Sequence, residues 1–199
     1  MELIFATQNE NKLKEIQKLF PPHIVVKSLL DIGCTEDIPE THPTIEGNAI
    51  QKAEYVAKKY GVNCFSDDTG LEVNALNGEP GVLSARYAGP EKNSANNMNL
   101  LLEKLKYHKD RSARFKTVIA LLIDGELTTF EGIVEGEIRK YQTGSHGFGY
   151  DPIFEPEKQG KTFAEMSMEE KNLLSHRARA IEKLVSYLKG KITLLEIRR

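Results

Sequence analysis

The 199-residue chain has little of what marks a secreted, membrane or nucleic-acid-binding protein. Its two cysteines, Cys34 and Cys64, are too few for a disulfide framework in a chain of this length, which favours a reducing, cytoplasmic setting. No apolar run approaches the roughly 20 residues of a membrane-spanning helix, and the first residues lack the basic region of a signal peptide. The formal net charge of −2 argues against a broad surface that binds nucleic acid or membrane. An anionic ligand must therefore be held by local positive charge.

Strand and helix patterns alternate along the chain and include one antiparallel hairpin, which predicts an α/β fold with a mixed sheet. Apolar stretches predict strands at 3–7, 24–29, 62–65, 114–124 and 127–138. Helical periodicity predicts helices at 9–20, 44–60, 94–105 and from a capping box at Ser167 and Glu170 to about Leu188. Function is expected in the long irregular loops between these elements.

Two adjacent acids, Asp67 and Asp68, follow a predicted buried strand. Neighbouring strand residues point to opposite faces, so one carboxylate can face a cleft while the other supports loop or helix N–H groups. Paired acids raise each other's pKa unless a cation separates them, and Mg²⁺ would resolve this conflict, with Glu40 as a possible further ligand. The alternative is that both acids cap a turn at Thr69 and Gly70. The local sequence leaves both interpretations open.

The segment ATQNENK joins the first predicted strand to the first helix. A helix N-terminus offers unpaired backbone N–H groups and the positive end of the helix dipole, which suit a phosphate group. Thr7, Asn9 and Lys12 add side-chain donors and one full charge. An ordinary helix cap beside a solvated lysine explains the same pattern. The Walker motif is absent, which excludes a Walker-type nucleotide site.

Two further groups of residues could contact a nucleotide. The glycine-rich segment GSHGFGYDPIF lets backbone approach a ligand closely, and Phe148 or Tyr150 could stack on a base. Inward packing of these aromatic rings is the alternative. Lys171, His176 and Arg177 lie near the end of the chain, where a basic run is normally a solvated helix face. The other histidines have no metal-ligand spacing.

Together, and in this order, the motifs TQNENK, PETHPTIEGNAIQKA, SDDTGLEV, GEPGVLSARYAG, GSHGFGYDPIF and EKNLLSHRARA closely resemble the inosine triphosphate pyrophosphatase family. The resemblance runs from about residue 4 to residue 188. It implies a Mg²⁺-dependent enzyme that hydrolyses ITP, dITP and XTP to the nucleoside monophosphate and pyrophosphate, clearing them from the nucleotide pool. It also implies a single domain over residues 1–199, with an elongated mixed sheet flanked by helices, two lobes and a central active-site cleft. Members of the family are usually homodimers.

The resemblance further implies roles for individual residues. Glu40 and Asp68 match the metal ligands, and Asp68 also matches the general base, which leaves Asp67 as a structural neighbour. Lys12, Lys52 and Lys171 are candidate cations for a triphosphate that carries about four negative charges. Positions that match substrate-binding residues are Thr7, Gln8, Asn9, Glu10, Asn11, Lys12, Lys52, Thr69, Phe148, Gly149, Tyr150, Asp151, Lys171, His176 and Arg177.

Purine selection makes a separate prediction about the last helix. His176 and Arg177 are expected to donate to the C6 carbonyl of inosine or xanthosine. Adenosine carries an amine at C6, which cannot accept these hydrogen bonds, so both donors would be left unpaired. On one straight helix, His176 would point far from the buried face and from Lys171. We therefore expect the helix to restart near Ser175, a good N-cap residue.

Three other functions are compatible with parts of the sequence. A pyrophosphatase acting on other unusual nucleotides, as in the related septum-formation-protein fold, would share the same class of chemistry. A non-catalytic nucleotide-binding module would not need the acids Glu40 and Asp68. A nucleic-acid-binding role fits poorly with the slightly acidic net charge.

Overall fold

The computed structural model describes residues 1–197, with side-chain surroundings up to Lys191. In this part of the chain seven strands form one sheet in the order β2-β1-β3-β5-β6-β7, with β4 paired to β3. The strands are β1 (Glu2–Phe5), β2 (Val25–Lys27), β3 (Cys64–Val73), β4 (Pro80–Gly81), β5 (Ser112–Ile123), β6 (Glu126–Ile138) and β7 (Phe154–Pro156). The strand β1 is parallel to β2 and β3, whereas β3–β4 and β6–β7 are antiparallel. The predicted mixed α/β sheet is confirmed.

Three of the α-helices lie between these strands in the chain, and two follow the last strand, β7. They are α1 (Glu10–Gln17), α2 (Ile45–Tyr60), α3 (Ser94–Lys104), α4 (Met168–Asn172) and α5 (His176–Ile197). No helix in the described residues is long and apolar enough to cross a membrane. The chain folds as two compact units, with the strands β3, β5 and β6 contributing to both.

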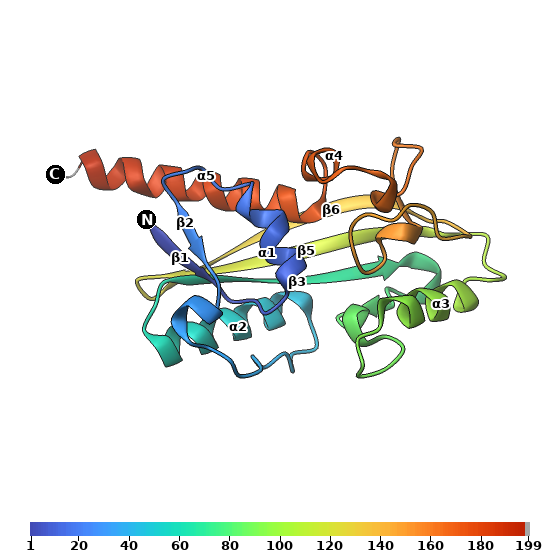
Figure 1. Ribbon diagram of the computed structural model, residues 1–199, viewed down its shortest axis with the longest axis horizontal. Helices are drawn as coiled ribbons and strands as arrows, with labels where there is room; N and C mark the ends of the chain where they lie inside the picture. Colours follow the sequence, from blue (N-terminus) through green and yellow to red (C-terminus); the bar gives the residue numbers. More distant parts are fainter. Residues whose placement is uncertain (198–199) are drawn as a thin grey trace. The chain divides into compact units, whose positions relative to one another are not determined.

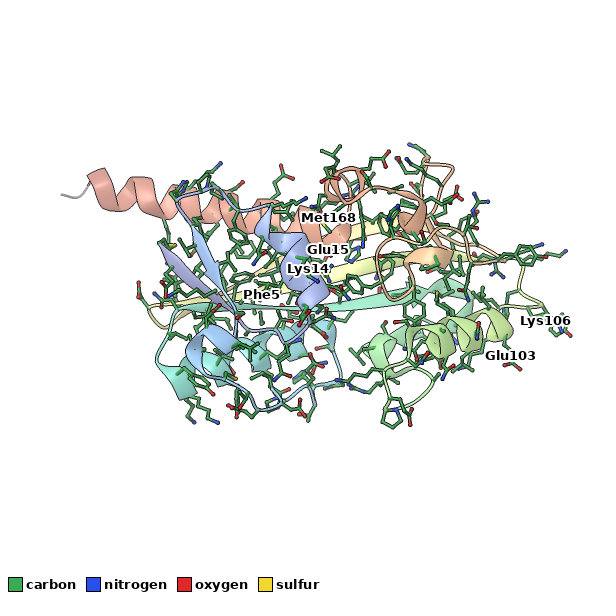
Figure 2. All side chains as sticks on the ribbon, in the orientation of Figure 1. Phe5, Lys14, Glu15, Glu103, Lys106 and Met168 are labelled. Carbon is green, nitrogen blue, oxygen red and sulfur yellow. The ribbon has the colours of Figure 1, made fainter. Side chains whose placement is uncertain are left out.

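Unit 1 comprises residues 1–68, 118–132 and the chain from Arg177 onward. Helix α2 covers one face of its strands, and α1 and α5 cover the other (Figure 1). Its core packs Phe5 and Phe65 as stacked rings, with centroids 4.6 Å apart, against aliphatic side chains of α1 and α5. Phe5 in β1 and Glu15 in α1 can be followed in Figure 2.

Unit 2 comprises residues 69–117 and 133–176. It has its own hydrophobic core, in which Phe115, Phe154 and Phe163 contact one another. Helix α3 lies on one face of its strands and α4 on the other (Figure 1). Each unit therefore buries a separate set of apolar side chains.

The predicted helix at 44–60 and the predicted antiparallel hairpin are confirmed, because the residues at their ends are strong signals. Thr44 caps α2 by accepting the Gly47 N–H, and Gly61 ends the helix with a φ of 66°. Asp124 and Gly125 form the hairpin turn between β5 and β6, with φ values of 51° and 81°. A two-residue hairpin loop of type I′ requires a positive φ at both of its central residues.

The expected end of β3 at residue 65 is wrong, and the alternative of a turn at Thr69 and Gly70, which the sequence left open, is not what the structure shows. The strand runs through both acids to Val73, and beyond them Leu71 pairs with Gly81 in β4. Leu71 and Val73 are buried, so pairing and burial continue after the two charges. Helix α1 ends at Gln17 rather than at residue 20, in keeping with Pro21, which disfavours helical backbone at the residue before it.

The end of the chain confirms one prediction and corrects another. The capping box of Ser167 and Glu170 is present, but it begins the short helix α4, and a new helix begins at His176. The predicted restart near Ser175 is therefore confirmed. The expected end near Leu188 is wrong, because α5 runs to Ile197. Helix-forming residues continue there, and the one intervening glycine costs only about 1 kcal/mol.

Candidate active site

The carboxylates of Asp67 and Asp68 bind different helices of unit 1. Asp67 accepts from Lys12 Nζ of α1 at 2.9 Å and from Arg177 Nε of α5 at 3.2 Å. Asp68 accepts from Lys52 Nζ of α2 at 3.5 Å. The predicted divergence of the two acids is confirmed, since α1 and α5 lie on one face of the strands and α2 on the other.

Asp68 belongs to a polar cluster beside α2, in which Asp68 and Lys52 are buried and Glu40 is partly exposed. Lys52 binds both Asp68 and Glu40, so one ammonium group joins the two predicted metal ligands. Burial raises the pKa of Asp68 in spite of the nearby lysines. Burial opposes the charge of Lys52, but Asp68 and Glu40 outweigh it and raise the pKa of this lysine. A buried carboxyl with a raised pKa, close to a cation, is a common feature of catalytic bases.

The residues present suit Mg²⁺ bound together with a nucleotide. The described residues contain no group of three or more His, Cys, Asp or Glu side chains placed to hold a metal ion. Mg²⁺ is commonly held by one or two carboxylates, with substrate phosphates and water supplying the other oxygens. Glu40 and Asp68, which already share a cation, match that donor set.

The loop before α1 is a capped helix start, as one of the two interpretations predicted. The Asn9 side chain accepts from the backbone N–H groups of Asn11 and Lys12, and Thr7 accepts from the N–H of Asn9 at 3.2 Å. Gln8 in the same loop is exposed, and so are Glu10 and Asn11 in the first turn of α1. Lys12 is not a solvated lysine, however, because its side chain is 14% exposed and pairs with Asp67. Burial lowers the pKa of Lys12, and Asp67 only partly offsets this effect.

Asp67 holds two cations inside unit 1. Burial alone would raise the pKa of Asp67, but Lys12 and Arg177 outweigh it and hold this pKa well below its usual range. Arg177 also pairs with Glu15 of α1, and all three of these side chains, Asp67, Arg177 and Glu15, are buried. Arg177 thus directs two of its N–H groups to carboxylates. Its expected role as a reader of the purine stays a prediction.

The predicted nucleotide contacts of unit 2 gather around Asp151. This buried carboxylate accepts from Lys171 Nζ at 2.7 Å and from the Phe148 N–H at 2.8 Å. The Lys171 ammonium also lies 5.1 Å from the centre of the Phe148 ring. Gly147 has a φ of 73°, and a Cβ there would lie 2.0 Å from Asp151, so the loop requires glycine. Gly149 is part of the same turn.

Three other predicted residues of unit 2 have structural partners. Tyr150 is buried and donates to the Ser84 carbonyl at 2.9 Å, so the inward-packing alternative holds for this ring and stacking on a base is left to Phe148. His176 is also buried, and its ring stacks on Phe115 with centroids 4.6 Å apart. Thr69 shares a hydrogen bond of 2.7 Å with Thr117.

Sequence reasoning missed two residues of the unit 1 cluster. Glu15 pairs with Arg177, and Asn48 donates to Asp68 Oδ2 at 3.4 Å. A signal for each was available, because helical residues three or four apart share a face. Glu15 lies three residues after Lys12, and Asn48 lies four residues before Lys52.

Comparison with known proteins places this arrangement in a family. A sequence model of the Ham1 family matches residues 3–187. This chain belongs to the Ham1 family. The match covers both groups of predicted site residues, in unit 1 and in unit 2.

Named relatives and solved structures of the Ham1 family resemble the chain over nearly its whole length. A protein of Flavobacterium johnsoniae named dITP/XTP pyrophosphatase is 58% identical over 188 residues, which cover 94% of this chain and 98% of that protein. A protein of the same name from Bacillus subtilis is 47% identical, covering 95% of this chain and 98% of the relative. The structure of the Staphylococcus aureus Ham1 protein matches with a TM-score of 0.88 at 43% identity, covering 96% of this chain and all of that one.

Proposed function

We propose that this protein hydrolyses dITP, XTP and ITP to the nucleoside monophosphate and pyrophosphate, and so removes non-standard purine nucleotides from the pool. The observation that carries the proposal is the cluster in which the buried Lys52 joins the buried Asp68 to the partly exposed Glu40. A pure binding module has no need of a buried carboxyl whose pKa is raised beside a second acid. The names of the relatives, dITP/XTP pyrophosphatase, agree with this chemistry.

The proposed reaction assigns a separate task to each group. Asp68 takes a proton from water, whose oxygen forms a bond to the α-phosphorus of the nucleotide. The bond from that phosphorus to the bridging oxygen breaks, and pyrophosphate leaves with the electron pair. Lys12 and Lys52 offset the charge on the phosphates. The N–H groups and polar side chains of residues 7–12 bind the triphosphate.

Glu40 and Asp68 would hold Mg²⁺ in this scheme. The ion, when bound with the nucleotide, would neutralise phosphate charge and polarise the phosphorus–oxygen bonds. Phe148, Asp151 and Lys171 are proposed to bind the rest of the nucleotide, with His176 and Arg177 selecting the base. From the resemblance of its motifs we also propose a homodimer that works in the cytoplasm.

Product analysis tests the proposal. The protein is incubated with dITP, with and without Mg²⁺, and the initial products are separated by ion-exchange chromatography. We expect dIMP and pyrophosphate in equal amounts, only when Mg²⁺ is present. Initial release of dIDP and orthophosphate would contradict the proposed cleavage site. Turnover of modified pyrimidine triphosphates in preference to dITP would favour a different substrate class.

A further inference from the structure

Asn48 and Lys52 lie one turn apart on α2 and contact opposite oxygens of the same carboxylate. Lys52 Nζ lies 3.5 Å from Asp68 Oδ1, and Asn48 Nδ2 lies 3.4 Å from Asp68 Oδ2. Residues four apart on a helix share a face, which is why both side chains reach this one group. Asn48 is 2% exposed, so water cannot readily replace its hydrogen bonds.

The second hydrogen bond of Asn48 determines which way its amide points. The Oδ1 atom accepts the backbone N–H of His42 at 2.8 Å. Only the oxygen of a side-chain amide can accept an N–H, so the NH₂ end of the Asn48 amide must face Asp68. A donor at that end restricts the rotation of the Asp68 carboxylate about its side chain.

The backbone that Asn48 holds belongs to the loop that carries Glu40. This loop is bounded by Pro39 and Pro43, and Lys52 holds the Glu40 side chain at its start. Asn48 holds the same loop two residues later, at the His42 N–H. One pair of α2 residues thus contacts both Glu40's loop and Asp68, which come from separate parts of the chain.

We propose that Asn48 is a positioning residue that sets the Asp68 carboxylate and the Glu40 loop in the arrangement needed to bind Mg²⁺ with the nucleotide. The inference rests on the proposed function, because it takes Glu40 and Asp68 as the metal ligands. Groups that orient metal ligands commonly change metal affinity or activity 10–100-fold when they are removed. Asn48 does not touch the substrate in this proposal and acts through Asp68 and Glu40.

The central test compares Asn48→Ala with Gln51→Ala. Gln51 is a matched control, because it holds the neighbouring residue of the same loop through two hydrogen bonds of 2.9 Å to Thr41. No hydrogen bond of the described residues joins Gln51 to Asp68. We measure kcat, KM and the Mg²⁺ concentration that gives half-maximal dITP hydrolysis. For Asn48→Ala we expect kcat to fall about 10–100-fold and the half-saturating Mg²⁺ concentration to rise.

For Gln51→Ala, which loosens the Glu40 loop at Thr41 but leaves the hydrogen bond to Asp68 in place, we expect a smaller fall in kcat and a smaller rise in the half-saturating Mg²⁺ concentration than for Asn48→Ala. A loss of folded protein would lower kcat but would not change the Mg²⁺ requirement. The metal-free proteins provide an independent measurement, amide hydrogen exchange by NMR. The His42 amide should exchange faster in Asn48→Ala, and the Thr41 amide should do so in Gln51→Ala.

If Asn48→Ala does not fold, Asn48→Asp keeps the volume and the acceptor for His42 but loses the donor to Asp68. We expect it to lose at least about tenfold in kcat while the His42 amide stays protected. Wild-type turnover and an unchanged Mg²⁺ requirement in Asn48→Ala would overturn the inference, and so would equal losses in the Asn48 and Gln51 variants. A wild-type protein that releases no pyrophosphate from dITP would instead overturn the proposed function.

Discussion

Asp67 and Asp68 are adjacent in β3, yet Asp67 binds Lys12 of α1 and Arg177 of α5, whereas Asp68 binds Lys52 of α2. The alternation of a strand sends the two carboxylates to opposite faces, where they meet different cations. Their pKa values consequently move in opposite directions, down for Asp67 and up for Asp68. One acid is suited to holding charges together, and the other to exchanging a proton.

Replacing Asp68 with asparagine should abolish turnover without unfolding the protein. The amide has almost the volume of the carboxylate, so packing in β3 should survive, while the base and the metal ligand are lost. Each of these contributions is typically about 10²–10⁴-fold in rate. The rate of pyrophosphate release measures the loss, and circular dichroism checks the fold. Activity within tenfold of wild type would show that another residue is the general base, and Asp67 would be the first candidate.

Replacing Asp67 with asparagine should act first on stability. Lys12 and Arg177 would lose a charged partner that is itself buried, and breaking a buried ion pair commonly costs about 3–5 kcal/mol. Urea unfolding measures the free energy of unfolding of the variant, with Asp68→Asn as its comparison. A variant as stable as Asp68→Asn would show that Asp67 is not the anchor of these cations.

The ratio of dITP to dATP turnover tests whether Arg177 selects the base. If this side chain donates to the C6 carbonyl, Arg177→Ala should lower dITP turnover more than dATP turnover and narrow the ratio. Arg177 is also held by Glu15 and Asp67, so both rates should fall to some extent. An equal fall for the two substrates would assign Arg177 to the support of Asp67 alone.

The loop near the start of α1 should show a pH-dependent contribution to stability. Hydrogen bonds from Lys59 and Tyr60 lower the pKa of the Glu36 carboxyl to about 2, from the ordinary glutamate value of 4.5. The backbone carbonyl of Glu36 accepts from the Gln8 side chain, which links Glu36 to the loop before α1. Because the folded pKa is the lower one, the stabilisation is complete above pH 4.5 and is lost as the pH falls toward 2.

Glu36→Gln should therefore melt below wild type at pH 7, and the difference should narrow between pH 4.5 and pH 3. Melting curves across this range measure it, and Glu103→Gln serves as a control, because Glu103 is exposed on α3 (Figure 2). A difference that stays constant with pH would mean that Glu36 acts through something other than its charge.

Local sequence signals were sufficient to predict elements whose first and last residues are marked by capping or turn residues nearby in the chain. The cap at Thr44, the glycine at 61, the Asp-Gly hairpin and the break before His176 could all be predicted, because backbone sterics and capping act within a few residues. The order of six motifs was enough to predict the family, and Glu40, Lys52 and Asp68 were named from it.

Only the tertiary structure decided which charges meet. The pairing of Lys12 with Asp67 spans 55 residues and that of Arg177 with Asp67 spans 110. No local rule encodes such distances, because they depend on how β3 is flanked by α1, α2 and α5. The same packing carried β3 through the position of a possible turn, buried a lysine that one interpretation placed in solvent, and placed Asn48 against Asp68. The sequence by itself determined the elements and the family, whereas long-range burial and pairing determined the environment and hence the pKa of each charged group.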